Sequence, residues 1–126
     1  MASNPKQQTT ARSKKLSSLI LGLPKSTSEP YGDHTKYIVG KKTFVYFMNN
    51  HHNCGIIGIW CKNTVEEQQR LVSLFPEMYF IPPYVGPNGW VGFRLDQPNV
   101  DWDEVFELVL AAYRLQAPKK LLEELA

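Results

Sequence analysis

The chain has 126 residues, of which 43% are hydrophobic and 21% charged, and its formal net charge at pH 7 is +2. This length and composition fit one ordinary globular domain with a single core. The sequence contains no run of about 18 apolar residues, which excludes a transmembrane helix, and we expect no membrane partner.

The small net charge conceals an uneven distribution. Residues 1–42 contain eight Lys or Arg against two Asp or Glu, a balance of +6, whereas residues 43–126 contain six against ten, a balance of −4. A basic first third is typical of chains that attract nucleic acid or an acidic partner. A solvated helix face that follows a disordered tail gives the same pattern, so charge alone leaves both interpretations open.

The chain begins with a polar segment, residues 1–10, that we expect to be a flexible tail, and residues 11–126 are predicted to form a single domain. The first helix is predicted over residues 11–21. Its apolar stripe follows the helical spacing i, i+3, i+4, i+7 at Leu16, Leu19, Ile20 and Leu23. Residues 25–34 are rich in Ser, Pro and Gly and are predicted to be a loop.

Three strand-like segments come next, over residues 36–39, 43–48 and 54–61. The connections between them, Gly40-Lys41-Lys42 and residues 49–53, are too short for a parallel crossover. The sequence therefore predicts an antiparallel meander.

Both cysteines, Cys54 and Cys61, lie in the third of these segments. A strand rises about 3.3 Å per residue, so an unbroken strand holds them more than about 20 Å apart. A disulfide needs Cα atoms within about 7 Å. We expect both cysteines to be reduced core residues, as is usual in the cytoplasm.

Two further helices have recognisable starts. Thr64 with Glu67 three residues later is a capping-box pattern, and Asp101 with Glu104 is a similar one. The first of these helices is predicted to end before Pro76 and the second to run over residues 102–116. Short strands are predicted over residues 77–81 and 90–95, and an amphipathic turn over residues 119–125.

The segment from residue 81 to residue 96 reads IPPYVGPNGWVGFRLD. The pair Asn88-Gly89 directly precedes an apolar run, which is typical of a tight hairpin turn because both residues tolerate positive φ. We expect Gly86 or Gly89 to adopt positive φ.

The predicted order of elements is α-β-β-β-α-β-β-α. This order favours a two-layer α+β domain, with an antiparallel sheet that carries its helices on one face.

This order, the segments PPYVGPNGWVGFRLD and DWDEVFELVLAAYRLQAPKKL, and the GKK-T-F hairpin resemble the MmcQ/YjbR-like family. The resemblance extends over roughly residues 16–122. It implies the CyaY-like, or secretion-chaperone-like, fold. The family has no established activity. A double-wing DNA-binding role has been suggested for it, and the resemblance implies the same role here as a hypothesis. The chain departs from the family pattern at residues 31–34 and at the polar tip of residues 49–53.

Motifs for metal binding or catalysis are not found in the sequence. The stretch His51-His52-Asn53-Cys54 has no recognised ligand spacing, and adjacent strand residues point to opposite faces. The GXXG formed by residues 86–89 is flanked by predicted strands, whereas KH domains need helices there. Asp101, Asp103 and Glu104 are explained by helix capping. We expect no catalytic residue, no metal and no cofactor.

Both faces of the predicted sheet carry large apolar side chains. Strand alternation places Phe44, Tyr46 and Met48 on one face of their strand, and Trp90 with Arg94 on one face of the last strand. Such a face can stack bases, can bury itself against a partner, or can be covered by a helix or loops of this chain.

Two functions follow from these patterns. The first is a small non-enzymatic protein that binds DNA or RNA weakly through basic hairpins. The candidate contacts are Lys36, Lys41, Lys42, Arg94, Tyr84, Asn88 and Trp90. The alternative is a protein-interaction module, as a homodimer or a chaperone-like adaptor, that uses the apolar sheet face.

Overall fold

The structure is a computed structural model that describes residues 5–49 and 56–125. Its elements in chain order are α1 Pro5–Leu21, β1 Ser26–Tyr31, β2 His34–Val39, β3 Lys42–Asn49, β4 Ile57–Cys61, α2 Val65–Leu74, β5 Tyr79–Phe80, the 3-10 turn η2 Gly86–Asn88, β6 Val91–Arg94, α3 Trp102–Gln116, α4 Lys119–Leu122 and the 3-10 turn η3 Glu123–Leu125. The helix α1 thus starts at Pro5, six residues before the predicted start at residue 11.

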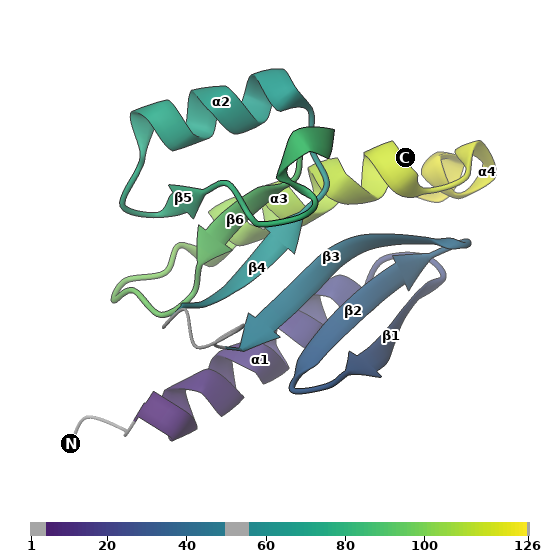
Figure 1. Ribbon diagram of the computed structural model, residues 1–126. Helices are drawn as coiled ribbons and strands as arrows, with labels where there is room; N and C mark the ends of the chain where they lie inside the picture. Colours follow the sequence, from purple (N-terminus) through teal and green to yellow (C-terminus); the bar gives the residue numbers. More distant parts are fainter. Residues whose placement is uncertain (1–4, 50–55, 126) are drawn as a thin grey trace.

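The six strands form one sheet in the order β1-β2-β3-β4-β6-β5, and every neighbouring pair is antiparallel. Figure 1 shows α1 and α3 behind this sheet, with α2 above it next to β5. The predicted α+β class with an antiparallel sheet is confirmed.

The strand β1 is an element that the sequence prediction missed, because residues 25–34 were expected to be a loop. It pairs with β2 from Ser26↔Val39 to Tyr31↔His34. All its residues after the first are exposed, so it has no apolar periodicity to reveal it. Pro30 is compatible with this strand because β1 lies at the edge of the sheet, where one side needs no ladder hydrogen bonds.

A bulge in β3 changes one of the predicted sheet faces. Tyr37 pairs with Val45 and Ile38 with Thr43, so Phe44 has no partner in β2. An extra residue of this kind interrupts the alternation of side chains. Phe44 is buried in the main core and meets the Tyr113 ring edge-on, with centroids 5.6 Å apart. The prediction that Phe44 shares a face with Tyr46 and Met48 is therefore wrong.

The main core lies between the sheet and the helices α1 and α3. Leu16 and Ile20 of α1 and Val105 and Val109 of α3 are fully buried in it. The two positions on each helix are four residues apart, which places them on one apolar face. The guanidinium of Arg12 also donates hydrogen bonds to the backbone carbonyls of residues 95 and 97. This contact ties α1 to the chain that follows β6.

A second, smaller core lies on the other face of the sheet. Met48, Trp60 and Trp90 are 2%, 6% and 7% exposed, and Phe80 and Val85 pack against them. Val85 and Trp90 belong to the long connection between β5 and β6, so this connection covers part of the face.

The same connection corrects the expected hairpin turn. Residues 81–90 separate β5 from β6 and include η2, so the turn is not a tight two-residue hairpin. Gly89 has φ +92, which confirms the prediction of positive φ at one of the two glycines. A Cβ at Gly89 would lie 2.5 Å from the carbonyl oxygen of Asn63.

Replacing Gly89 with alanine tests this constraint. Both the positive φ and the contact with the backbone of residues 63–65 oppose a side chain here. We expect G89A to lower the free energy of unfolding by about 2–4 kcal/mol. Gly22, whose Cβ would make ordinary contacts at 3.5 Å, is the matched control. Urea unfolding followed by tryptophan fluorescence measures both variants, and equal stabilities of G89A and G22A would contradict the prediction.

Candidate functional site

The predicted nucleic-acid residues do not form one surface. On β2, the Nζ of Lys36 lies 3.6 Å from the carboxylate of Glu29 and 5.8 Å from the ring centroid of Tyr31. On β6, Arg94 donates two hydrogen bonds of 3.0 Å to the carboxylate of Asp96. Both cations therefore already have an acidic partner within the chain.

The three predicted loop residues differ in what they expose. Trp90 is buried in the second core, so its ring is not available for base stacking. Tyr84 is 75% exposed and has positive φ. The backbone carbonyl of Asn88 accepts a hydrogen bond of 2.6 Å from the Nζ of Lys62.

Lys41 and Lys42 lie at the turn between β2 and β3, where the structure brings other lysines close. The turn residue Gly40 lies against Pro118, because a Cβ there would be 3.1 Å from the proline ring. The Nε2 of Gln116 also donates a hydrogen bond of 3.1 Å to the carbonyl of Thr43. Lys119 and Lys120, which follow Pro118, therefore lie next to the turn.

Lys25 approaches the same end of the sheet from β1. Its neighbour Ser26 pairs with Val39, which in turn pairs with Lys42. The hydroxyl of Tyr113 donates a hydrogen bond of 2.7 Å to the carbonyl of Pro24, which holds this segment against the end of α3. We call these five residues the lysine cluster: Lys25, Lys41, Lys42, Lys119 and Lys120.

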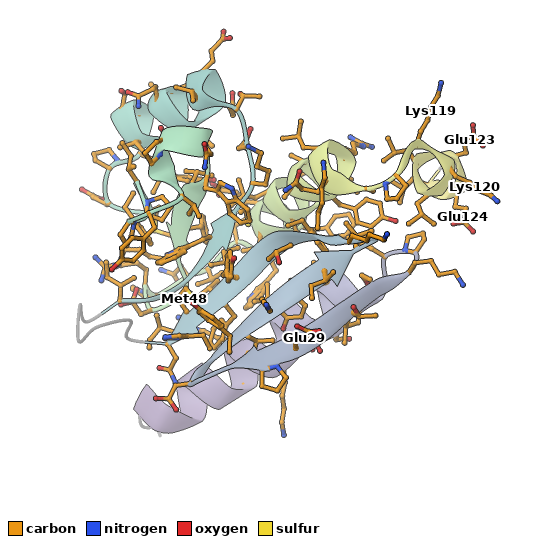
Figure 2. The ribbon with its side chains drawn as sticks, turned by 45° about the vertical axis from the view of Figure 1, so that its right-hand side comes forward. Glu29, Met48, Lys119, Lys120, Glu123 and Glu124 are labelled. Carbon is orange, nitrogen blue, oxygen red and sulfur yellow. The ribbon has the colours of Figure 1, made fainter. Side chains whose placement is uncertain are left out.

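The members of the lysine cluster are all exposed. Within residues 11–49 and 56–125, no carboxylate lies within 4.0 Å of their ammonium groups. Glu123 and Glu124 follow on the next turn, and Figure 2 shows them beside Lys119 and Lys120 at this end of the chain. The two dibasic pairs were visible in the sequence, but their proximity depends on the contact between Gly40 and Pro118.

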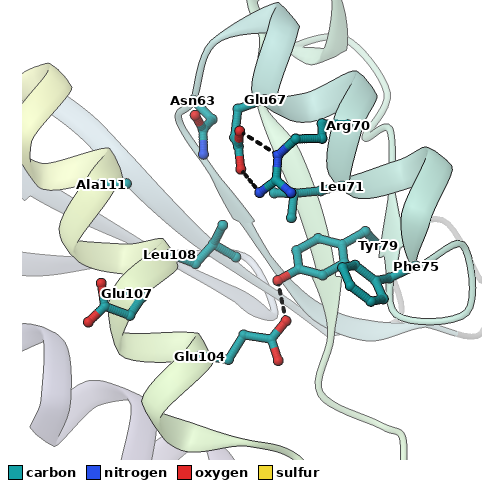
Figure 3. Close-up of a pocket in the computed structure, with 10 residues that line it drawn as sticks. All are labelled: Asn63, Glu67, Arg70, Leu71, Phe75, Tyr79, Glu104, Glu107, Leu108 and Ala111. Carbon is teal, nitrogen blue, oxygen red and sulfur yellow. Dashed lines mark hydrogen bonds and ion pairs between the residues drawn. The ribbon is translucent and has the colours of Figure 1, made fainter.

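A second feature is an open cleft of about 400 Å³ between α2 and α3. Figure 3 shows the residues that line it: Asn63, Glu67, Arg70, Leu71, Phe75, Tyr79, Glu104, Glu107, Leu108 and Ala111. Its apolar members give the cleft a hydrophobic wall, while its rim is charged. Sequence reasoning did not find this cleft, because its residues come from two helices and a strand that are distant in sequence.

Hydrogen bonds fix the polar groups of the cleft. The hydroxyl of Tyr79 donates a hydrogen bond of 2.5 Å to the carboxylate of Glu104, and Arg70 pairs with Glu67 across one turn of α2. Burial, together with the neighbouring Glu104 carboxylate, raises the pKa of Tyr79 above its ordinary value. Tyr79 is therefore a hydrogen-bond donor that stays protonated.

Both predicted helix caps are present. The Oγ1 of Thr64 accepts a hydrogen bond from the backbone N–H of Glu67, and the carboxylate of Asp101 accepts two from the start of α3. The reciprocal bond of a capping box is replaced, because the backbone N–H of Thr64 donates to the Oδ1 of Asn63. This leaves the Glu67 carboxylate free to pair with Arg70.

Several predictions concern residues 50–55, which lie outside the described residues. These include His51, His52 and Cys54, so their part in metal binding or pairing stays a prediction. Cys61 is a free, buried thiol, and burial raises its pKa. Among the residues that the structure describes, no three His, Cys, Asp or Glu side chains are grouped so as to hold a metal ion. None of the described helices combines the length and apolar character needed to cross a membrane.

Comparison with known proteins identifies the family. A family model described as YjbR matches residues 21–115. The chain belongs to the YjbR family. The resemblance inferred from its motifs is confirmed, and the matched part of the YjbR chain contains the whole sheet, α2 and nearly all of α3.

A solved structure has the same fold as this YjbR protein. The crystal structure of the Deinococcus radiodurans protein DR2400, with a DUF419 domain, aligns with a TM-score of 0.68 at 17% identity. The alignment covers 82% of this chain and 76% of that one. None of the curated proteins matches this chain.

The raised pKa of Tyr79 predicts a pH effect on stability. The unfolded state ionises its tyrosines near pH 10, whereas the folded state keeps Tyr79 neutral, so this stabilising contribution is present below about pH 10 and is lost as the pH rises. Between about pH 9 and about pH 11, we expect the free energy of unfolding of the wild type to fall by about 1 kcal/mol more than that of Y79F.

Urea titrations at several pH values check this expectation. The exposed Tyr84 provides the control, and Y84F should lose stability as steeply as the wild type. If Y79F loses as much stability as the wild type over the same pH range, the folded state does not protect the neutral phenol.

Proposed function

We propose that this YjbR protein binds nucleic acid through phosphate contacts made by the lysine cluster. The observation that carries the proposal is that five exposed lysines lie at one end of the sheet: one directly before β1, two at the β2–β3 connection and two in α4. A lysine ammonium binds a phosphate as a point charge and contributes affinity without reading the base. Several such charges on one surface can follow a phosphate backbone.

The lysine cluster modifies the set of residues expected from the sequence. Lys41 and Lys42 remain in it. Lys36 and Arg94 contribute less, because releasing them from Glu29 and Asp96 costs part of what a phosphate contact gains. Trp90 is buried in the second core and cannot stack on a base, so the proposal rests on charge.

Binding of this kind is weak and depends strongly on salt. The chain carries a formal net charge of only +2 and has a pI of about 8.5, below the values above about 9 that are typical of nucleic-acid-binding domains. Its affinity is expected to lie within the non-specific range, with a Kd of roughly 1–100 µM at physiological salt.

We further propose that binding, and not catalysis, is the activity of this chain. The polar groups that most resemble catalytic ones have structural partners. Asp101 caps α3 and Glu104 accepts the Tyr79 hydroxyl. Cys61 is buried with a raised pKa, which disfavours the thiolate that a nucleophilic cysteine needs.

The protein-interaction alternative has less support from the sheet face on which it was based. Three large side chains of this face, Met48, Trp60 and Trp90, are buried within the chain itself. Tyr31, which is 50% exposed, is the aromatic side chain that this face still presents at the edge of the sheet.

The salt dependence of binding tests the nucleic-acid proposal. Each phosphate contact on duplex DNA contributes a slope of about −0.9 to a plot of log K against log salt concentration. We expect K41A/K42A and K119A/K120A each to reduce the magnitude of this slope by up to about two. Fluorescence anisotropy with labelled duplex and single-stranded DNA and RNA measures the slope.

The matched control removes the same charge elsewhere. Lys14 and Lys15 are exposed on α1, outside the lysine cluster, so K14A/K15A should change the slope by less than about one. Equal losses in all three double variants would show that only total charge matters. No binding at low salt, at protein concentrations of about 100 µM, would overturn the proposal.

A further inference from the structure

The side chain of Asn63 is largely buried beside the cleft between α2 and α3, and its amide nitrogen is the part that reaches the cleft. Asn63 is 7% exposed, and its Oδ1 accepts a hydrogen bond of 2.8 Å from the backbone N–H of Thr64. This bond fixes the orientation of the amide, because an oxygen must face the Thr64 N–H. The Nδ2 group must then face the other way.

That direction is into the cleft. Figure 3 shows the amide nitrogen of Asn63 pointing towards Leu108, across the space between the two helices. Nothing within residues 11–49 and 56–125 accepts a hydrogen bond from this nitrogen. The nitrogen is accessible to water in the cleft, so a ligand carbonyl oxygen can take the place of that water as the acceptor.

The opposite side of the cleft is acidic. Glu104 and Glu107 of α3 line it, whereas the carboxylate of Glu67 is neutralised by Arg70. The Glu104 carboxylate accepts one hydrogen bond, from Tyr79, and has further lone pairs for a second donor. Figure 3 shows the Glu104 side chain directed towards Tyr79, whereas the Glu107 side chain extends to the side of α3 away from α2, so a cation in the cleft would meet the Glu104 carboxylate.

Apolar side chains lie between these two polar sides. Leu71 and Leu108 are nearly buried, Phe75 is half exposed, and the Tyr79 ring completes the wall. A volume of about 400 Å³ is within the usual range for small-molecule sites. The apolar wall with a few convergent polar groups is also typical of them.

We propose that this cleft binds a small organic ammonium ligand that also carries a carbonyl group and an apolar body. The ammonium group lies at Glu104, the carbonyl oxygen accepts from the Nδ2 of Asn63, and the apolar body packs on Leu71 and Phe75. The proposal is independent of nucleic-acid binding, because no member of the lysine cluster lines the cleft.

Three related probes separate these contacts. L-phenylalaninamide carries all three groups, phenethylamine lacks the carbonyl group, and 3-phenylpropionamide lacks the ammonium group. Backbone and side-chain amide shifts in ¹H–¹⁵N NMR spectra report binding and its place. We expect L-phenylalaninamide to bind with a Kd of about 1 mM and to shift the side-chain NH₂ of Asn63, and each of the other two probes to bind at least several-fold more weakly.

Two variants test the polar contacts. Glu104→Gln keeps an acceptor for Tyr79 but removes the charge, and should weaken L-phenylalaninamide by about tenfold. Asn63→Asp keeps an acceptor for Thr64 but replaces the donor with a carboxylate. The added charge attracts both ammonium probes, so the expected result is loss of the preference for L-phenylalaninamide over phenethylamine. The control is Glu66→Gln, an equal change of charge at an exposed position of α2 outside the cleft, which should alter binding less than twofold.

Three results would overturn the proposal. The first is an absence of shifts in the cleft with about 10 mM L-phenylalaninamide, ten times the expected Kd. The second is equal binding of all three probes, which would indicate contact with the apolar wall alone. The third is an equal loss of affinity in E66Q and E104Q, which would indicate a general effect of charge.

Discussion

The side chain of Gln68 joins α2 to the connection between β5 and β6. It is 2% exposed on α2, and its Nε2 donates hydrogen bonds of 2.7 Å and 2.6 Å to the carbonyls of Gly86 and Trp90. Leaving these carbonyls unpaired in a buried setting would cost free energy, so the β5–β6 connection is held against α2. Gly89 permits the close approach, because no Cβ separates it from the backbone at Asn63.

The two surfaces of this connection have different consequences. On the sheet side, Val85 and Trp90 complete the second core, so a face that looked available for base stacking is largely filled by the chain itself. On the α2 side, the connection packs against the backbone of Asn63, whose side-chain Oδ1 accepts from the Thr64 N–H in place of the usual Glu67 contact at the helix start. The amide that points into the α2–α3 cleft is therefore oriented by the same packing that closes the sheet face.

Charge in this protein has to be interpreted pair by pair. Lys36 and Arg94, which lie on the sheet, have carboxylate partners, whereas Lys41 and Lys42 have none within the part of the chain that the structure describes. The net charge of the whole chain does not distinguish lysines and arginines that have a carboxylate partner from those that have none. The lysine cluster gives a stronger field at one place than a formal charge of +2 suggests, and the proposal of phosphate binding rests on this local field.

The sequence by itself determined the family, the α+β class, both helix caps and the positive φ near Asn88, because each depends on local chemistry: apolar periodicity, side-chain oxygens beside free N–H groups, and the lack of a Cβ. Tertiary structure decided the rest. The strand β1 exists only because β2 offers it a ladder, and Phe44 joins the main core only because a bulge turns it. The lysine cluster and the α2–α3 cleft assemble residues distant in sequence, and no local pattern encodes contacts that arise when helices and turns pack on one sheet.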